Sequence, residues 1–354
     1  MNVVELLREA VLQGASDIHI VPGAPPLLRI SGALAALPNR PAYTADQAQQ
    51  LILELLTEQQ RTALARDFVV DFSMNMEQTR YRGNVVFQRN GLEAVLRLIP
   101  VQVPTPEELM FPPIMTELTT LKSGLIIVSG PTGAGKSTSL ACMVDLINQR
   151  RRGNIVTIED PIEFIHPNKN CVVSQREIGI HAVSFSAALR SVMRQDPDVV
   201  MIGEMRDLET ISAVITLAET GHLVLATLHS ADAPQAVDRM IDVFEARQQQ
   251  QIRTQLSGVL KAVITQTLLP RAGIGGRVAM REVMIVNPAI ANLIRSGKNH
   301  EIYAAMEIGA SEGMISSGRA LADLARKGLI ESSEAQSRQP QVDPLLARRG
   351  KKSI

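Results

Sequence analysis

The chain contains the run Gly130-Pro131-Thr132-Gly133-Ala134-Gly135-Lys136-Ser137-Thr138, which matches the phosphate-binding pattern G-x-x-x-x-G-K-[ST]. Residues Leu125 to Ser129 before it predict a buried strand, and Leu140 to Asn148 after it predict a helix. In that context backbone N–H groups and the helix N-terminus surround a nucleotide's phosphates. We expect Lys136 to reach the outer phosphates and Ser137 to ligate Mg²⁺. A glycine turn required only for steric reasons is the alternative, and the Lys-Ser pair after the last glycine argues against it.

Length and composition restrict the class of protein. The 354 residues suggest two or three domains, and 45% hydrophobic residues suffice for sizeable cores. Basic and acidic residues balance at 36 each, so the global charge gives no indication of nucleic-acid binding. Two cysteines, Cys142 and Cys171, are too few for a disulfide framework or a four-thiolate zinc site. With no apolar stretch of about 18 residues and no secretory signal, we expect a cytoplasmic protein without direct membrane insertion.

The first hundred residues predict an α+β domain, residues 1–99. Apolar residues from Val3 to Val11 recur at helical spacing, and Thr44-x-x-Gln47 predicts a helix N-terminus. Short strand-like runs follow, bounded by Gly, Pro or Asn. They are Leu27 to Ile30, Val69 to Phe72, Tyr81 to Phe87 and Ala94 to Ile99. Five prolines between residues 100 and 113 then interrupt helix and strand alike, so we place a linker over residues 100–117.

Residues 118–331 predict a doubly wound α/β domain, because continuous apolar strands alternate with helical segments. The strands are Leu125 to Ser129, Ile155 to Ile158, Val199 to Ile202 and Leu223 to Thr227. The helices are Phe185 to Arg194, Leu208 to Glu219, Ala233 to Val243 and Gln250 to Leu268. The remaining residues, 332–354, are polar, contain two prolines and end in a basic cluster, which predicts a disordered tail.

Phosphoryl transfer needs a group that orients the attacking water, a metal ion on the outer phosphates and positive charge against the transition state. Glu204 follows the apolar strand Val199 to Ile202, and strand carboxyl ends face the ligand crevice in a doubly wound sheet. Glu204 is our first candidate for polarising water. Because no Asp stands here for the metal's outer shell, we expect Glu204 to share the Mg²⁺ role. The alternative is a solvated loop carboxylate.

A second acidic group, Glu159 and Glu163, follows the strand Ile155 to Ile158. Close carboxylates in the crevice need Mg²⁺ or arginine to stay ionised. An Asp-Pro turn with solvent-facing acids is the alternative. His222 and His229 flank the strand Leu223 to Thr227 and are candidates for sensing the terminal phosphate, although a lone histidine is more often structural. Metal ligation by this pair is disfavoured, since no Cys or HExxH-type spacing accompanies it.

In this order and at these separations, the four stretches resemble the Walker A motif, aspartate box, Walker B motif and histidine box of the secretion ATPases. The resemblance is strongest to the PilT-type retraction ATPases of type IV pili. It covers residues 1 to about 331 and extends beyond the core motifs. The further matching stretches are Ala15-Ser16-Asp17-Ile18-His19, Arg80-Tyr81-Arg82-Gly83-Asn84, Gln175-Arg176-Glu177 and Gly203-Glu204-Met205-Arg206-Asp207. The phosphate loop alone is shared by many unrelated proteins, whereas the ordered set is specific.

The resemblance implies an N-terminal PAS-like domain joined to a RecA-like ATPase domain, a homohexameric ring, and ATP bound with Mg²⁺ between the two domains. Matched position by position, it implies that Arg80, Arg82 and Arg97 bring positive charge to the phosphates. Arg239 is a weaker candidate that would act across a subunit boundary. Guanidinium groups on a moving domain couple closure to hydrolysis, because they neutralise transition-state charge.

The implied function is retraction of type IV pili, and hence twitching motility, powered by ATP hydrolysis. The implied partners are an inner-membrane platform protein, through which the ring would associate peripherally with the membrane, and a paralogous retraction ATPase. One departure concerns the family's run A-I-R-N-L-I-R near the C-terminus, whose first arginine is Ala291 here. Extension ATPases differ in usually carrying a Cys-x-x-Cys metal site, and no such pair occurs in this sequence.

Three hypotheses follow. The first is a hexameric retraction motor. The second is a related assembly or secretion ATPase, or a ring that translocates nucleic acid, which the neutral charge balance disfavours. The third is an accessory ring subunit that binds nucleotide with little turnover. Lys136, Ser137 and Glu204 argue against the third, whereas Ala291 keeps it open.

Overall fold

The computed structural model describes residues 2–30, 32–76, 79–99, 102–273 and 275–338. Contacts divide the chain into two units, Met1–Gln102 and Val103–Ile354, and each is described separately. The N-terminal unit consists of α1 (Val3–Leu12), β1 (Asp17–Ile20), β2 (Leu27–Ile30), β3 (Ala33–Ala36), α2 (Ala45–Glu54), α3 (Glu58–Asp67), β4 (Val69–Met76), β5 (Thr79–Gln88) and β6 (Gly91–Ile99).

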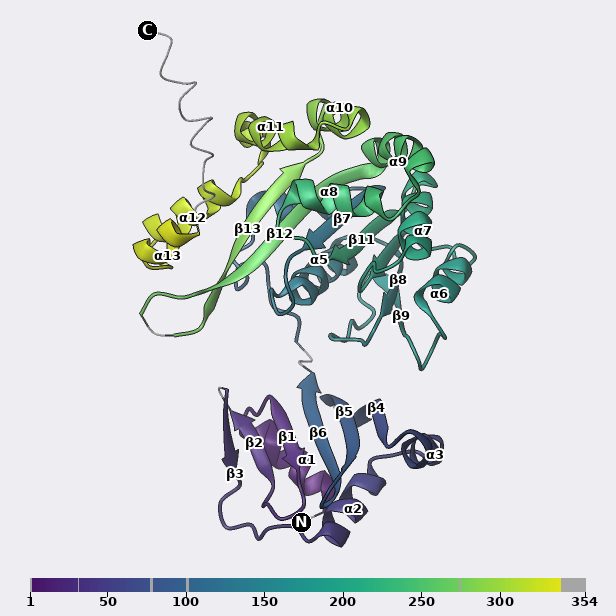
Figure 1. Cartoon of the computed structure of the whole chain (residues 1–354), viewed down its shortest axis with the longest axis vertical. Helices are drawn as coiled ribbons and strands as arrows, with labels where there is room; N and C mark the ends of the chain where they lie inside the picture. The colour runs from purple at the N-terminus through teal and green to yellow at the C-terminus, as the bar shows by residue number, and fades with distance from the viewer. Residues whose placement is uncertain (1, 31, 77–78, 100–101, 274, 339–354) are drawn as a thin grey trace. The chain divides into compact units, whose positions relative to one another are not determined.

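The N-terminal unit is one antiparallel sheet with the strand order β3-β2-β1-β6-β5-β4 (Figure 1). Alternate residues of β6, such as Leu92, Ala94 and Leu96, enter a core to which α1, α2 and α3 also contribute. Helix α2 begins where the sequence predicts a cap: Thr44 accepts from the backbone N–H of Gln47, and the Gln47 side chain accepts from that of Thr44. The opposite face of β5 and β6 carries both polar and apolar side chains.

The second unit contains the phosphate-binding pattern. It consists of α4 (Pro113–Leu118), β7 (Gly124–Ser129), α5 (Lys136–Arg150), β8 (Gly153–Glu159), β9 (Cys171–Glu177), α6 (Phe185–Val192), β10 (Val199–Ile202), α7 (Leu208–Glu219), β11 (Leu223–Leu228), α8 (Ala233–Asp242), α9 (Ala246–Val259), β12 (Leu260–Pro270), β13 (Arg277–Ile285), α10 (Pro288–Ser296), α11 (Ile302–Ile308), α12 (Ser317–Arg326) and α13 (Ser332–Ser337), with short 3₁₀ turns at Asn299–Glu301 and Gly309–Glu312.

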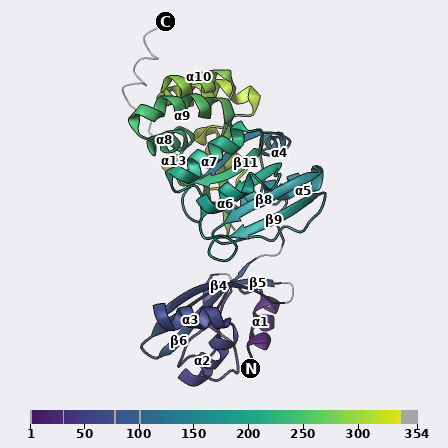
Figure 2. The same cartoon turned by 90° about the vertical axis from the view of Figure 1, so that its right-hand side faces the viewer.

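The second sheet has the order β13-β12-β7-β11-β10-β8-β9, and its neighbours are parallel except for β12 and β13. Ile126 and Val128 of β7 enter a core with α4 and α5 on one face. Leu125 and Ile127 enter a second core on the other face with α6 to α10. Figure 2 shows α5 on the opposite side of the strands from α6 and α7. Burial on both faces explains why these strands are continuously apolar.

The structure corrects the prediction of a helix over 250–268. Helix α9 ends at Val259, and β12 begins at Leu260 without an intervening turn. The β-branched residues Val263, Ile264 and Thr265 extend between β7 and β13 and hydrogen-bond to both strands. Their shape suits a pleated central strand, and Gly258 in the last turn of α9 is the sequence signal that precedes the change.

Two other segments differ from expectation. Part of the proposed linker forms helix α4, which begins at Pro113, a helical position where the missing N–H costs nothing. Residues from Val103 onward group with the second unit, and residues 100 and 101 lie outside the described chain. At the other end, Ser332–Ser337 form α13, and its Ala335 is buried with Leu269 and Leu321. The prediction of a disordered tail is therefore wrong for these residues, and residues 339–354 lie outside the described part.

Candidate functional site

The predicted motifs meet at one edge of the second sheet. Strands β7, β8, β10 and β11 are parallel, and their registers place Ser129 beside Leu228 and Ile202 beside both Ile158 and Ala226. The residues that follow these strands therefore lie along one edge. In a doubly wound sheet this carboxyl edge is the ligand site.

The phosphate loop depends on glycine for backbone reasons. Gly130, Gly133 and Gly135 have φ values of 145°, 76° and 82°, in the left-handed region that favours glycine. A Cβ on Gly130 would also lie 2.2 Å from the backbone oxygen of Gln266 in β12. Pro131, Thr132 and Gly133 are exposed, Ala134 is buried, and Ser137 and Thr138 are partly exposed in the first turn of α5. The loop therefore presents backbone N–H groups and a hydroxyl at the start of a helix.

Lys136 folds back over this loop. Its Nζ donates to the carbonyl oxygens of Gly130 at 2.8 Å and Pro131 at 3.0 Å, and only 9% of the residue is exposed. Burial lowers the pKa of Lys136, while Glu204 and Glu163 act in the opposite direction. The ammonium group is thus held where loop-bound phosphate oxygens would replace the two carbonyl acceptors.

Glu204, His229 and Lys136 form a connected line of polar groups. Lys136 Nζ lies 3.4 Å from His229 Nδ1, and His229 Nε2 lies 3.1 Å from Glu204 Oε1. Because an ammonium group can only donate, Nδ1 accepts and the ring proton belongs on Nε2, which donates to Glu204. Burial and then the charge of Lys136 lower the pKa of His229, so the ring is neutral at pH 7.

The carboxylate of Glu204 has a second partner. Arg206 Nη2 donates to Glu204 Oε2 at 2.8 Å. Burial alone raises the pKa of Glu204, but the hydrogen bond and charge of Arg206, together with further charges that include Lys136, lower the pKa overall. Glu204 is therefore ionised at neutral pH, and its partly exposed carboxylate can accept a proton or polarise a water molecule.

Glu159 and Glu163 differ in their surroundings. Glu159 is buried, and its carboxyl accepts from Thr157 Oγ1 at 2.6 Å, Gln175 Nε2 at 3.1 Å and the backbone N–H of Glu163 at 3.4 Å. Burial raises the pKa of Glu159 to about 7. The side chain of Glu163 is exposed. The structure thus places Glu159 inside the edge of the site as a buried acid and Glu163 on its surface.

The raised pKa of Glu159 predicts a pH-dependent stability. Between pH 4.5 and about 7 the unfolded chain loses this proton while the folded chain keeps it, so this group's contribution to stability falls as pH rises. The full penalty is up to about 3 kcal/mol. We expect Glu159→Gln, which mimics the neutral acid, to raise the melting temperature relative to wild type at pH 8 and to have little effect at pH 4.5.

Thermal unfolding of the wild type, Glu159→Gln and the exposed control Glu117→Gln checks this at both pH values. An equal difference between wild type and Glu159→Gln at the two pH values would contradict the assignment of a pKa near 7 to Glu159.

The three arginines of the first unit share one face of its sheet. Arg82 of β5 pairs with Arg97 of β6, and Arg80 lies two residues before Arg82 on the same face. Arg80 is buried, whereas Arg82 is exposed. Arg97 Nε donates to Asp17 Oδ1 at 2.9 Å, which holds its guanidinium in place. The three arginines therefore lie on one face of this sheet.

The remaining two candidates differ. Arg239 of α8 donates to the backbone oxygen of His229 in the same chain at 2.6 Å, so within one chain it holds the segment that carries His229. His222 precedes β11, beside Gly124 at the start of β7, and its Nδ1 lies 3.0 Å from Thr220 Oγ1 and Leu217 O. It therefore lies at the amino edge of the sheet, a strand length from the phosphate loop, and the chain does not bring it to the site.

Several residues at the site are not predicted as functional from the sequence, although Gln175 lies in one of the matching stretches of the sequence. Gln266 of β12 contacts the phosphate loop, and Thr157 and Gln175 hold Glu159. Arg206 lies in a stretch recognised by resemblance but was not among the candidate residues, although a cation two residues from a carboxylate is a usable signal. Within the described residues, no group of three or more His, Cys, Asp or Glu side chains is arranged to hold a metal ion.

The fold and the site together define a P-loop nucleotide-binding protein. Comparison with known proteins narrows the class. Residues 2–333 match the model of the family described as "Type II/IV secretion system protein". The chain is 44% identical to the Pseudomonas aeruginosa "Type IV pilus retractation ATPase PilT", over 96% of this chain and 98% of that protein. It is 40% identical to the P. aeruginosa "Type IV pilus ATPase PilU", over 95% and 88%.

A solved structure is similar over the same range. The crystal structure of "the Pilus Retraction Motor PilT and Bound ADP" superposes with a TM-score of 0.91 at 42% identity and covers 99% of both chains. This chain therefore belongs to the type II/IV secretion system protein family, and the PilT-type resemblance is confirmed. The predicted fold class, an α/β chain with an N-terminal domain before an ATPase domain, is confirmed as well.

Proposed function

We propose that this chain is an ATPase that powers the retraction of type IV pili. The observation that carries the proposal is the line from Lys136 through His229 to Glu204 beside the phosphate loop, because it joins a phosphate-binding cation to an ionised carboxylate. Two relatives support pilus retraction as the process that ATP hydrolysis powers. They are a P. aeruginosa retraction ATPase and, at 40% identity, the "Twitching motility protein" of Neisseria gonorrhoeae.

In this proposal each group has a chemical role. Backbone N–H groups of the loop and Lys136 bind the phosphates, and Ser137 would hold Mg²⁺ with help from Glu204. The ion would stabilise the charge of the outer phosphates. Glu204 polarises the attacking water, and neutral His229 fixes the orientation of its carboxylate. Arg80, Arg82 and Arg97 supply further positive charge. The functional assembly is a homohexamer that lies in the cytoplasm and acts on an inner-membrane platform protein. In the described residues, every helix is too short or too polar to cross a bilayer.

Counting surface pili by electron microscopy tests whether the ATPase retracts pili or assembles them. We expect a strain without this chain to carry several times more pili than wild type, since fibres that cannot be withdrawn accumulate. Restoring the gene should restore the wild-type number. A loss of pili would instead indicate an assembly or secretion ATPase. An unchanged number would favour an accessory role.

A further inference from the structure

We propose that Arg281 is a positioning residue for the phosphate loop, which it connects through Gln266 to the segment Thr105–Phe111. The inference rests on the proposed nucleotide site and adds a route by which the start of the ATPase unit affects nucleotide affinity. Neither residue belongs to the motifs recognised in the sequence.

The side chain of Gln266 joins the loop to its own helix. Its Nε2 donates to the backbone oxygen of Ala134 at 2.5 Å, and its Oε1 accepts from Ser139 Oγ of α5 at 2.8 Å. The backbone oxygen of Gln266 also lies so close to Gly130 that no Cβ fits there. Gln266 therefore touches the loop near its beginning and near its end, and a shift of β12 or of this amide changes the loop's shape.

Arg281 of β13 fixes this amide from behind. Its Nε donates to Gln266 Oε1 at 3.0 Å, and its Nη1 donates to the backbone oxygens of Leu109 at 2.8 Å and Met110 at 3.4 Å. The guanidinium carbon lies 5.0 Å from the centre of the Phe111 ring. Arg281 is 5% exposed, and burial lowers its pKa to about 10, so it remains charged at pH 7. Neutral acceptors, not a carboxylate, thus compensate a buried charge, which is a costly arrangement for packing alone.

The segment that Arg281 holds is a compact, capped turn. Thr105 and Glu108 cap each other, with Thr105 N to Glu108 Oε2 at 2.9 Å and Glu108 N to Thr105 Oγ1 at 3.2 Å. Met110 adopts φ = 50°, an uncommon value for a residue other than glycine. The turn lies at the start of the second unit, shortly after the boundary at Gln102.

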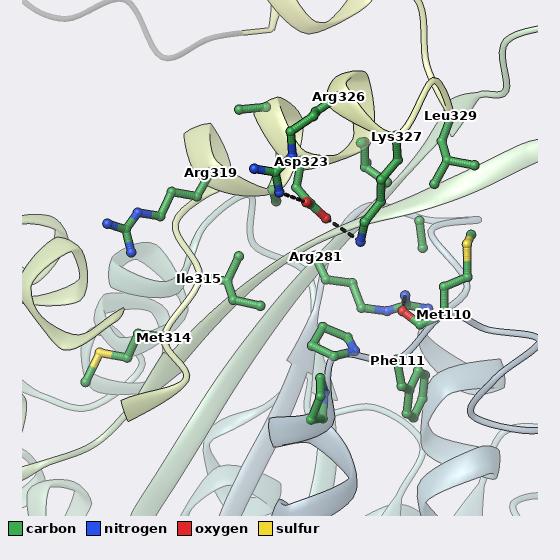
Figure 3. A pocket seen from close by; sticks show the side chains of 16 residues that line it. Met110, Phe111, Arg281, Met314, Ile315, Arg319, Asp323, Arg326, Lys327 and Leu329 are labelled. Carbon is green, nitrogen blue, oxygen red and sulfur yellow. Dashed lines mark hydrogen bonds and ion pairs between the residues drawn. The ribbon is translucent and has the colours of Figure 1, made fainter. Parts of the chain in front are cut away.

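The turn has room to move. A groove of about 740 Å³ separates Met110–Pro113 from α12, and Arg281 lies at its floor (Figure 3). On the far wall Asp323 pairs with Arg326 at 2.5 Å and Lys327 at 2.6 Å. On this side the turn borders the groove, and the hydrogen bonds to Arg281, together with the packing of Phe111 against the core, hold it in place.

Nucleotide affinity measured on the full chain tests the proposal. We expect Arg281→Met to raise the Kd for ADP about 5- to 20-fold, because Gln266 Oε1 loses one of its two donors and keeps only Ser139 Oγ. The melting temperature should stay within a few degrees of wild type. Arg281 has no carboxylate partner, so its replacement leaves no unpaired charge buried. Arg281→Lys should retain affinity only in part. An ammonium group lacks the planar set of donors with which Arg281 reaches the Gln266 amide and two backbone carbonyls at once. Arg277→Met, an exposed arginine on the same strand, is the matched control.

A double-mutant cycle separates positioning from general destabilisation. Glu108→Ala breaks the cap of the turn; we expect a Kd change of about threefold in wild type and none in Arg281→Met. Additive effects, or an unchanged Kd in Arg281→Met, would overturn the proposal. If Arg281→Met does not fold, Arg281→Lys takes its place in the cycle. We then expect Glu108→Ala to change the Kd for ADP less in Arg281→Lys than in wild type, so that the two effects are not additive. Wild-type protein that binds no ADP would refute the proposed nucleotide site instead.

Discussion

Glu204→Gln is expected to lower ATP turnover by about 100- to 10,000-fold, the range of a lost general base. The amide keeps the size of the side chain and still accepts a hydrogen bond from Arg206, but it cannot take a proton or hold the negative charge that His229 faces. ADP affinity should change by no more than about threefold, because binding depends mainly on the loop and Lys136. Steady-state phosphate release and calorimetric titration with ADP measure the two quantities.

The matched control for this result is Glu209→Gln, an exposed carboxyl in the first turn of α7. It should retain wild-type turnover. Turnover of Glu204→Gln close to that of an active wild type would exclude Glu204 as the base. If purified wild type and purified Glu204→Gln are equally inactive, the result would favour an accessory ring subunit that binds nucleotide with little turnover.

Lys136→Ala is expected to lower turnover at least about 100-fold and to weaken ADP binding as well, because it removes the cation that the loop presents to the phosphates. The change also releases the carbonyls of Gly130 and Pro131, which face the loop interior, so the fold should not depend on it. Lys122→Ala, an exposed lysine before the other end of β7, serves as the control. Nucleotide affinity equal to wild type in Lys136→Ala would contradict the role given to this side chain.

The two variants separate binding from chemistry. Lys136→Ala affects both nucleotide affinity and turnover, whereas Glu204→Gln affects turnover alone. His229 connects the two groups, so its position links the presence of phosphate near Lys136 to the orientation of Glu204. This link is the physical reason to expect hydrolysis only when the loop is filled.

Much of the second unit could be predicted from the sequence, because buried parallel strands are apolar throughout and glycine marks the loop. The bounds of β10 and α7 match the prediction residue for residue. The same rule that brings Glu204 and His229 to the carboxyl edge also explains the failure of His222: it precedes its strand, and parallel strands begin at the opposite edge. Both histidines belong to the predicted histidine box, but the direction of the strand places only His229 at the site.

The rest of the site could not be read from motifs, since it depends on contacts between distant segments. Gln266 lies on β12, part of which the sequence predicts as a helix, and it reaches the loop only because β12 pairs with β7. The pKa of Glu159 is raised by its burial in the folded chain, and the hydrogen bond that partly offsets this effect comes from Gln175 of the neighbouring strand β9. Spacing along the chain carries no signal for either contact.

The most direct test of the motor is to watch labelled pili withdraw in living cells that carry only Lys136→Ala or only Lys122→Ala. A retraction motor that uses this site predicts frequent withdrawals with Lys122→Ala and at least a tenfold lower frequency with Lys136→Ala, at equal protein levels. Withdrawal at the wild-type frequency in Lys136→Ala cells would contradict the proposal that nucleotide bound at this loop powers retraction.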